Sequence, residues 1–380
     1  MIKDTTLNYT LNVIARWAVG LVFLFSAFVK GVDPLGTAYK VQEYMTAWEV
    51  FGFTFEWALP LANVLSVALI CAEFLVGVLL ITNSFRLLSA WMLVLMMLFF
   101  TATTLIDAIT NKVSDCGCFG DAVKLTNWQT FWKNVALDVP TVWIFLTRWL
   151  RYRRRFERDW IIALGAGVVM LVFAIYNIKH EPVIDFRPWK EGTRMVEERE
   201  AMNHMIFKNI ASGEEVTVDY PNGGWDQVPA EYKDFDKWEI ISSTSDEPFE
   251  VKADGFSMMD VEGEDHSVDL LLSEEGLIVV TIHSLQKVDE EGVAEVQRAL
   301  TQAEENGTKI VMLTSALPEE VQAWLYENRI SGLDYLFADA TAIKAIMRGN
   351  PGFMYMKDAT VVKKTRKAEE LENCELKIEN

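Results

Sequence analysis

Five apolar stretches of membrane-spanning length occupy the first half of this chain and limit what it can fold into. A helix needs about 20 mostly apolar residues to cross a hydrocarbon core about 30 Å thick, because it rises about 1.5 Å per residue. The stretches that reach this length run from about residue 11 to 29, 57 to 82, 87 to 109, 128 to 149 and 160 to 178. The first 180 residues offer no polar layer that could cover so many apolar helices. The sequence therefore predicts an α-helical membrane bundle of five spans.

The balance of charge changes near residue 180, where the apolar half ends. Residues 1–180 hold 15 Lys and Arg against 12 Asp and Glu, whereas residues 181–380 hold 20 against 42, so the net charges are +3 and −22. The total of −19 excludes nucleic-acid binding, which needs a basic surface. We expect a lipid bilayer around the first half and an acidic, water-exposed region in the second.

Basic residues set the expected orientation. Six arginines lie in residues 148–158, between the fourth and fifth stretches, and such clusters mark the cytoplasmic side. The N-terminus is then cytoplasmic and attached to an uncleaved first span. The loops at about 30–56 and 110–127, together with residues 180–380, lie outside. We expect a bacterial inner-membrane protein with a periplasmic C-terminal region.

Charged residues inside spans are costly and therefore mark candidate functional positions. Arg16, Lys30, Glu73 and Asp138 lie within or at the ends of predicted spans, with Lys30 near the outer surface. Arg16 and Glu73 lie at similar distances from the inner ends of their predicted spans, so the two could form a buried ion pair. The four charges either hold the bundle together or belong to a proton or quinone path. All four histidines lie outside the spans, so we expect no metal site in the bilayer.

Two of the four cysteines form a closely spaced pair, Cys116-Gly117-Cys118, just outside the third span. A disulfide in such a small ring would be strained and easily reduced, which favours thiol-redox chemistry. A structural turn and a metal site are the alternatives. Cys71 lies within the second span and Cys374 in the charged C-terminal stretch, and neither position indicates chemistry.

The membrane half resembles the DoxX/MauE group of bacterial membrane proteins. The resemblance rests on residues 16–30, which read RWAVGLVFLFSAFVK and precede Asp33-Pro34, and on Glu73 followed by Gly77. The run Cys116-Gly117-Cys118-Phe119-Gly120 is similar to the MauE branch. The resemblance implies a four-helix bundle over residues 1–150. It also implies redox chemistry outside the inner membrane, which is disulfide formation for MauE-type proteins and quinone-coupled sulfur oxidation for DoxX-type proteins.

Strands alternate with helices after about residue 250, which predicts an α/β domain with a parallel sheet. This order resembles the thioredoxin-like domain of the TlpA/peroxiredoxin class, with Asn350-Pro351 at the position of the cis-proline. The position of the Cys-x-x-Cys motif reads Ile282-His283-Ser284-Leu285-Gln286-Lys287-Val288 and contains no cysteine. We expect a docking surface at His283, Asn350 and Pro351 in place of a thiol site, and a last helix over about 366–376.

The expected organisation is a four-span membrane domain over 1–150, an Arg-rich loop and fifth span over 151–180, a β-rich connecting region over 181–249 and a thioredoxin-like domain over 250–380. The leading hypothesis is a component of periplasmic thiol-redox or protein-maturation chemistry. In it, Cys116 and Cys118 exchange disulfides with a partner protein held by the thioredoxin-like domain. A quinone is the candidate cofactor. The alternative is a non-enzymatic, membrane-anchored scaffold of an envelope complex.

Overall fold

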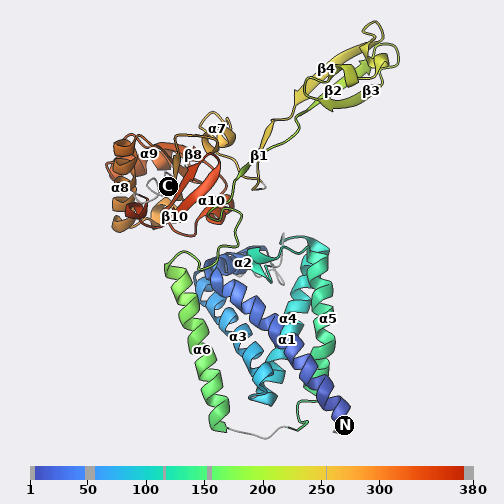
Figure 1. Cartoon of the computed structure of the whole chain (residues 1–380), viewed down its shortest axis with the longest axis vertical. Coiled ribbons are helices and arrows are strands. Elements are labelled where there is room, and N and C mark those ends of the chain that lie inside the picture. Colours follow the sequence, from blue (N-terminus) through green and yellow to red (C-terminus); the bar gives the residue numbers. More distant parts are fainter. Residues whose placement is uncertain (1–4, 48–55, 114–116, 152–155, 254, 372–380) are drawn as a thin grey trace. The chain divides into compact units, whose positions relative to one another are not determined.

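The computed structural model describes residues 5–47, 56–113, 117–151, 156–253 and 255–371. The chain divides into two compact units, Met1–Arg187 and Pro188–Asn380, and each is described here by itself. Among the described residues, the first unit is helical and the second contains every strand (Figure 1).

The five long helices of the first unit, α1, α3, α4, α5 and α6, follow the predicted apolar stretches, and shorter helices lie between them. Their bounds are α1 Thr6–Val32, α2 Pro34–Ala47, η1 Glu56–Leu61, α3 Ala62–Thr82, α4 Arg86–Thr110, η2 Gly120–Ala122, α5 Asn127–Leu146 and α6 Phe156–Lys179. Helix α1 packs along α3, and α4 packs along α5. Gly20 and Gly77 allow the close approach of α1 and α3, because a Cβ on Gly77 would lie 3.0 Å from the Gly20 carbonyl oxygen.

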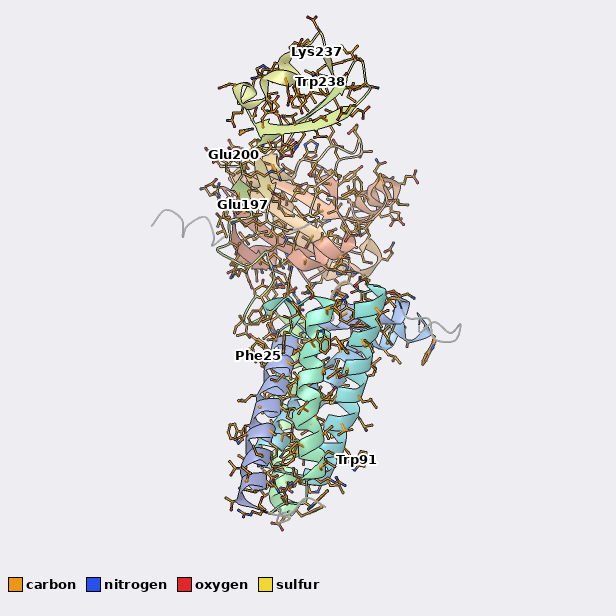
Figure 2. The ribbon with its side chains drawn as sticks, turned by 90° about the vertical axis from the view of Figure 1, so that its right-hand side faces the viewer. Phe25, Trp91, Glu197, Glu200, Lys237 and Trp238 are labelled. Carbon is orange, nitrogen blue, oxygen red and sulfur yellow. The ribbon has the colours of Figure 1, made fainter. Side chains whose placement is uncertain are left out.

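Four helical segments in the described part of the chain are long and apolar enough to cross a membrane. They are Thr6–Val32, Trp57–Thr82, Arg86–Thr110 and Phe156–Lys179. Their outer faces carry large exposed apolar side chains, among them Phe25 and Trp91 (Figure 2). The remaining predicted span forms helix α5, but Lys133, Asp138 and Pro140 leave it less apolar than the other four.

The expectation of a loop over residues 30–56 is wrong for the part that the structure describes. Helix α1 continues through Lys30 to Val32, and α2 begins directly after it at Pro34. Asp33 lies between the two helices, and its carboxylate accepts a hydrogen bond from the Gly36 backbone N–H at 2.9 Å. Proline at the first position of a helix costs no hydrogen bond, which explains the immediate restart.

The second unit is built around a five-stranded sheet with the order β10-β9-β6-β7-β8. The strands are β6 Leu277–Ile282, β7 Lys309–Thr314, β8 Asp334–Phe337, β9 Gly352–Lys357 and β10 Thr360–Thr365. Strands β6, β7 and β8 are parallel, whereas β9 and β10 run antiparallel to them as a closing hairpin. This topology is thioredoxin-like, as the order of elements in the sequence predicts.

Helices cover both faces of this sheet. The helical elements are α7 Ser267–Leu271, η5 Leu285–Lys287, α8 Glu290–Asn306, α9 Pro318–Glu327, α10 Ala340–Ile346 and η6 Ala368–Glu370. Ile278 and Val280 face a core formed with α8 and α9, whereas Val279 faces a core formed with α7 and α10. Of the helix expected over 366–376, the described residues contain only the short turn η6, and residues 372–376 lie outside the described part.

A small sheet is inserted before the thioredoxin-like core. Strands β2 Met202–Asn209, β3 Glu215–Pro221 and β4 Trp238–Ser245 pair in the order β3-β2-β4, with the short turns η3 Trp225–Gln227 and η4 Ala230–Lys233 between β3 and β4. Its core contains Phe207, Tyr220 and Val228, and Trp238 packs against them. Two short strands flank this sheet in the sequence and pair with each other, β1 Val196–Glu198 and β5 Phe249–Val251.

Candidate functional site

Cys118 lies in a tight turn between α4 and α5. Gly117 and Gly120 both have positive φ angles, of 60° and 48°, which glycine adopts without strain. The Cys118 side chain is half-buried in the helical unit. Its predicted partner Cys116 falls outside the described residues, as does Cys374. The structure therefore places one member of the predicted pair.

A buried ion pair lies next to this turn. Lys30 Nζ of α1 lies 2.5 Å from Glu73 Oε1 of α3, and the two side chains are only 8% and 1% exposed. Ser26, one helical turn before Lys30, has its hydroxyl oxygen 2.9 Å from Glu73 Oε2. The same hydroxyl lies 2.8 Å from the Cys118 carbonyl oxygen. Ser26 thus connects the cysteine turn to the ion pair inside the bundle.

These residues line one cavity of about 460 Å³. Its wall is mostly apolar and aromatic, with side chains from α1 to α5, and Ser26, Lys30, Glu73 and Cys118 contribute polar groups. A volume of this size fits a small organic molecule or the head of a larger apolar one, and a largely apolar lining with a few polar groups is typical of ligand sites.

Further polar contacts surround the cavity. Tyr44 of α2 donates a hydrogen bond to Asp107 Oδ2 of α4 at 2.7 Å. Lys133 of α5 lies 4.3 Å from the centre of the Phe119 ring, in the turn that carries Cys118. Lys133 and Tyr44 both line the cavity. Helix α2, absent from the sequence-based expectation, therefore supplies part of the site.

Arg16 and Glu73 do not form the ion pair that depth along the helices would allow. The Arg16 guanidinium instead donates to Asn12 Oδ1 and to the Leu80 carbonyl, each at 3.0 Å. Asp138 of α5 accepts a hydrogen bond from the Thr101 hydroxyl at 3.0 Å. Neither residue lines the cavity, so the structure brings Lys30 and Glu73 together and leaves Arg16 and Asp138 elsewhere.

The thioredoxin-like unit brings its three predicted residues to neighbouring positions. His283 follows β6, and the adjacent Ser284 is held by Asn350, whose amide donates to the Ser284 carbonyl at 2.8 Å. The Asn350–Pro351 bond is cis. Gly292 of α8 makes room for the proline, because a Cβ there would lie 2.7 Å from Pro351 Cδ.

The surroundings of His283 disfavour its protonation. Burial, followed by the positive charges of Lys344, Lys287 and Arg348, lowers the pKa of His283 to about 4. The side chain is therefore neutral at physiological pH. It offers a hydrogen-bonding group in a basic environment within an otherwise acidic region.

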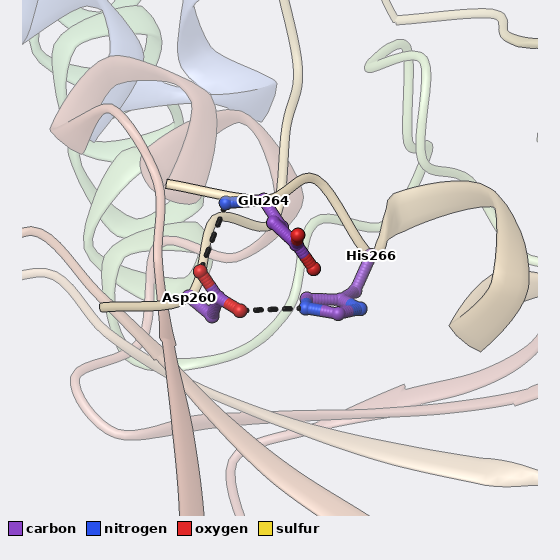
Figure 3. A group of neighbouring side chains, drawn as sticks. All are labelled: Asp260, Glu264 and His266. Atoms are coloured by element: carbon purple, nitrogen blue, oxygen red, sulfur yellow. Dashed lines mark hydrogen bonds and ion pairs between the residues drawn. The ribbon is translucent and has the colours of Figure 1, made fainter. Parts of the chain in front are cut away.

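A separate polar cluster lies in the loop before β6. Asp260 accepts hydrogen bonds from His266 Nε2 and from the Glu264 backbone N–H, each at 2.9 Å (Figure 3). The hydrogen bond between the two side chains raises the pKa of His266 and lowers the pKa of Asp260. These contacts close the loop, and we assign no ligand to the cluster.

Three residues of the site, Ser26, Tyr44 and Lys133, were not singled out by sequence analysis. Ser26 precedes Lys30 by four residues, so the two share a helix face, and this spacing was the available signal. Tyr44 lies in α2, and its contact with Asp107 could be predicted only once that helix was recognised.

One protein family matches the membrane half of the chain. Residues 8–147 match the family described as methylamine utilisation protein MauE. No curated protein matches the chain.

Solved structures of thioredoxin-like proteins are similar to parts of the chain. The thioredoxin domain of a thiol-disulfide oxidoreductase from Bacteroides vulgatus has 13% identity and a TM-score of 0.26, covering 33% of this chain and 92% of its own. StoA from Bacillus subtilis has 16% identity and a TM-score of 0.25, covering 32% and 95%. A thioredoxin-like protein from Bacteroides caccae has 9% identity and a TM-score of 0.23, covering 67% and 83%.

The chain thus contains a MauE family domain over residues 8–147, as the family match shows, followed by a domain whose sheet topology is thioredoxin-like.

Proposed function

We propose that this protein is a membrane component of thiol-redox or protein-maturation chemistry, in which Cys116 and Cys118 exchange disulfides with a partner protein. The observation that carries the proposal is the position of Cys118 at the wall of a cavity that also contains the Lys30–Glu73 pair. The match to the MauE family supports the same reading.

The exchange would proceed through the two cysteines in turn. A thiolate of the partner attacks the Cys116–Cys118 disulfide and forms a mixed disulfide, and one loop cysteine leaves as a thiolate. A second partner thiolate then breaks the mixed disulfide. The partner ends with a disulfide, and the loop ends as a dithiol that has gained two electrons and two protons.

The loop dithiol then needs a two-electron acceptor, and a lipid-soluble quinone is the candidate. Dithiol and quinone would give disulfide and quinol, so electrons and protons balance. The apolar cavity next to Cys118 supports this candidate. Lys30 would donate a hydrogen bond to a quinone oxygen there, and the Glu73 carboxylate would accept one from a quinol hydroxyl. Arg16 and Asp138 lie away from the cavity and would stabilise the bundle.

The partner would meet the loop outside a bacterial inner membrane, with the N-terminus in the cytoplasm and the thioredoxin-like domain in the periplasm. The six arginines in residues 148–158 support this orientation. His283, Asn350 and Pro351 would form the docking surface, because the sequence Ile282–Val288 offers no cysteine for exchange.

A scaffold without redox activity is the second candidate. The same absence of cysteine from Ile282–Val288 favours it, since the thioredoxin-like domain is then a binding module alone. In that case the membrane domain anchors a stable envelope complex, and the two loop cysteines are structural.

Trapping of the mixed disulfide tests the proposal. Cys116→Ser and Cys118→Ser each leave one loop thiol. When that thiol attacks the disulfide of an oxidised partner, the mixed disulfide lacks the loop neighbour that resolves it in this direction of the exchange. We expect at least one variant to accumulate a larger species on non-reducing gels that reductant dissolves, and mass spectrometry identifies the linked protein.

Cys71→Ser is the matched control, because Cys71 lies within α3 rather than in the loop. It should leave the wild-type pattern unchanged. The redox proposal fails if neither loop variant traps a partner while both insert and fold. A partner that co-purifies stoichiometrically with every cysteine variant would establish the scaffold instead.

A further inference from the structure

Three basic side chains converge at the end of β6, the middle strand of the five-stranded sheet. Lys287 lies in η5, shortly after β6, whereas Lys344 lies in the last turn of α10 and Arg348 in the turn that follows. His283, the first residue after β6, is half-buried, and the charges of all three act on its ring. We call Lys287, Lys344 and Arg348 the basic cluster.

Hydrogen bonds fix the two segments that carry the basic cluster to each other. The Asn350 side-chain amide donates to the Ser284 carbonyl at 2.8 Å, and the Asn350 side-chain oxygen accepts from the Ser284 backbone N–H at 3.2 Å. The Arg348 guanidinium donates to the Lys344 carbonyl oxygen at 2.6 Å. The basic side chains therefore extend from a rigid frame next to the cis peptide bond of Pro351.

The charge around His283 is opposite to that of the surrounding chain. Residues 181–380 carry a net charge of −22. Burial lowers the pKa of His283, and the largest charge effects, from Lys344, Lys287 and Arg348, all lower it further. Burial likewise lowers the pKa of Lys344, with Lys287 and Arg348 adding to the effect. Like charges held together repel one another, so an anion bound among them would be stabilised.

Acidic residues limit the extent of this positive surface. Asp339 caps α10 by accepting hydrogen bonds from two backbone N–H groups, and it raises the pKa of Lys344 against the effect of the other two cations. Asp289 caps α8, whose first turn also contains Glu290 and Glu291. The flanking carboxylates confine the positive surface to the neighbourhood of His283. A short anionic segment fits such a surface, whereas an extended polyanion would be repelled by its borders.

We propose that the basic cluster is a docking site for a short acidic segment of a protein, whose aspartate or glutamate carboxylates lie among Lys287, Lys344 and Arg348 and beside His283. Carboxylates accept charge-assisted hydrogen bonds from lysine and arginine side chains, which gives the site its selectivity. That the segment belongs to the partner in disulfide exchange rests on the proposed function. The docking surface at His283, Asn350 and Pro351 then selects partners with exposed acidic residues.

Fluorescence anisotropy of labelled peptides measures this docking. The probes are a tetraglutamate and a tetraglutamine peptide, each flanked by glycines and free of cysteine, and each is titrated with the full chain in nanodiscs of phosphatidylcholine. We expect the tetraglutamate peptide to bind and the tetraglutamine peptide not to bind, although the net charge of −19 of the whole chain repels anions. Added salt should weaken the binding, because the cluster is partly exposed.

Variants of the basic cluster locate the binding. Lys344→Gln and Arg348→Gln should each weaken it about fivefold, as expected for the loss of one partly exposed ion pair. Lys344→Arg keeps the charge and should retain the affinity. Lys309→Gln is the matched control, because exposed Lys309 begins β7, which is parallel to β6, and so lies at the opposite end of the sheet from His283. It should bind the tetraglutamate peptide as the wild type does.

The His283 ring reports on the same site by NMR. A carboxylate placed beside the ring favours its protonated form. The tetraglutamate peptide should therefore move the titration of this ring to higher pH, and the tetraglutamine peptide should leave it unchanged. A peptide that binds without moving the titration of His283 occupies another surface and contradicts the proposal.

Two further results would overturn the docking site. One is equal affinity for the two peptides, and the other is an equal loss of affinity in Lys344→Gln and Lys309→Gln. Stronger binding of a phosphoserine peptide than of the tetraglutamate peptide would assign the cluster to phosphate in place of carboxylates. Because the probes contain no thiol, a negative result leaves the disulfide-exchange proposal untouched. A failure to trap a mixed disulfide would likewise leave the docking site untouched.

Discussion

Lys30 Nζ lies 2.5 Å from Glu73 Oε1 within the helical bundle, where the two side chains are 8% and 1% exposed. A buried ion pair gives little net stability, because the cost of desolvating both charges offsets their attraction. The pair lies at the wall of a cavity, beside the turn that carries Cys118, where the proposed chemistry would use both charges.

Removal of one partner of this pair should be far more damaging than removal of both. Glu73→Leu leaves a buried ammonium group without its counter-charge and should cost about 3–5 kcal/mol of stability. Lys30→Met combined with Glu73→Leu should recover most of that loss. Denaturation of the single and double variants in detergent checks the difference, and equal losses in both would show that the pair is not desolvated.

The loop thiols should change redox state in living cells. If Cys116 and Cys118 exchange disulfides, trapping with a mass-adding thiol reagent will give a mixed population of oxidised and reduced protein. Blocking respiration should shift that population toward the dithiol, because the electron acceptor is then exhausted. A pair that stays in one state under all conditions would contradict the exchange and support the scaffold.

Arg187 should be a major stabilising residue at the end of the first unit. Its side chain is 2% exposed, and the guanidinium lies 2.7 Å from Asp185 Oδ1 and 3.0 Å from Glu181 Oε2. Although burial opposes its charge, hydrogen bonding to Asp185 and the two carboxylates raise the pKa of Arg187. Arg187→Ala leaves these carboxylates without the cation and should cost about 3–5 kcal/mol.

The matched control for that change is Arg194→Ala. Arg194 also binds an aspartate, Asp358, at 2.9 Å, but the side chains are 47% and 63% exposed. An exposed pair contributes about 0–1 kcal/mol, so thermal unfolding should barely shift. Similar shifts of the unfolding temperature in the two variants would show that burial of the Arg187 network adds no stability.

His283 should make the thioredoxin-like domain less stable in mild acid. Burial and nearby cations place its pKa at about 4, below the value of about 6.5 for an unfolded chain. Between these values the unfolded chain binds a proton that the folded chain does not, so stability rises with pH across this window and falls as pH drops. Above about pH 6.5 the effect is absent.

Two measurements check this assignment. A titration of the histidine ring signals by NMR should show one resonance that titrates near pH 4. Lys344→Gln should move that resonance to higher pH, since the cation no longer opposes protonation. A His283 that titrates near 6.5 in the wild-type chain would show that the ring is solvated.

Long helices and buried strands were the predictable part of this fold. The apolar stretches gave the positions of α1, α3, α4, α5 and α6, and the continuous apolar runs gave β6 and β7. Helix α2 was missed because its composition is mixed and it carries no membrane-length run. Strong periodicity and length identify an element, whereas a short helix depends on contacts that the sequence does not display.

Some residues of the candidate site were predictable from the sequence, but their partners were not. Lys30, Glu73 and Cys118 were each singled out, yet depth along the helices matched Glu73 with Arg16. The axial depth of a residue says nothing about its direction around the helix, and that direction depends on packing. Gly20 and Gly77 bring α1 and α3 close together, with Lys30 and Glu73 on the facing surfaces.

The pairing of β1 with β5 makes the three-stranded sheet between them an exchangeable module. Glu198 and Phe249 are directly opposite each other, so the intervening chain leaves and re-enters the domain at the same point. The inserted sheet has its own small core around Phe207. A variant in which a two-residue hairpin turn joins Glu198 to Phe249 should therefore keep the thioredoxin-like domain folded.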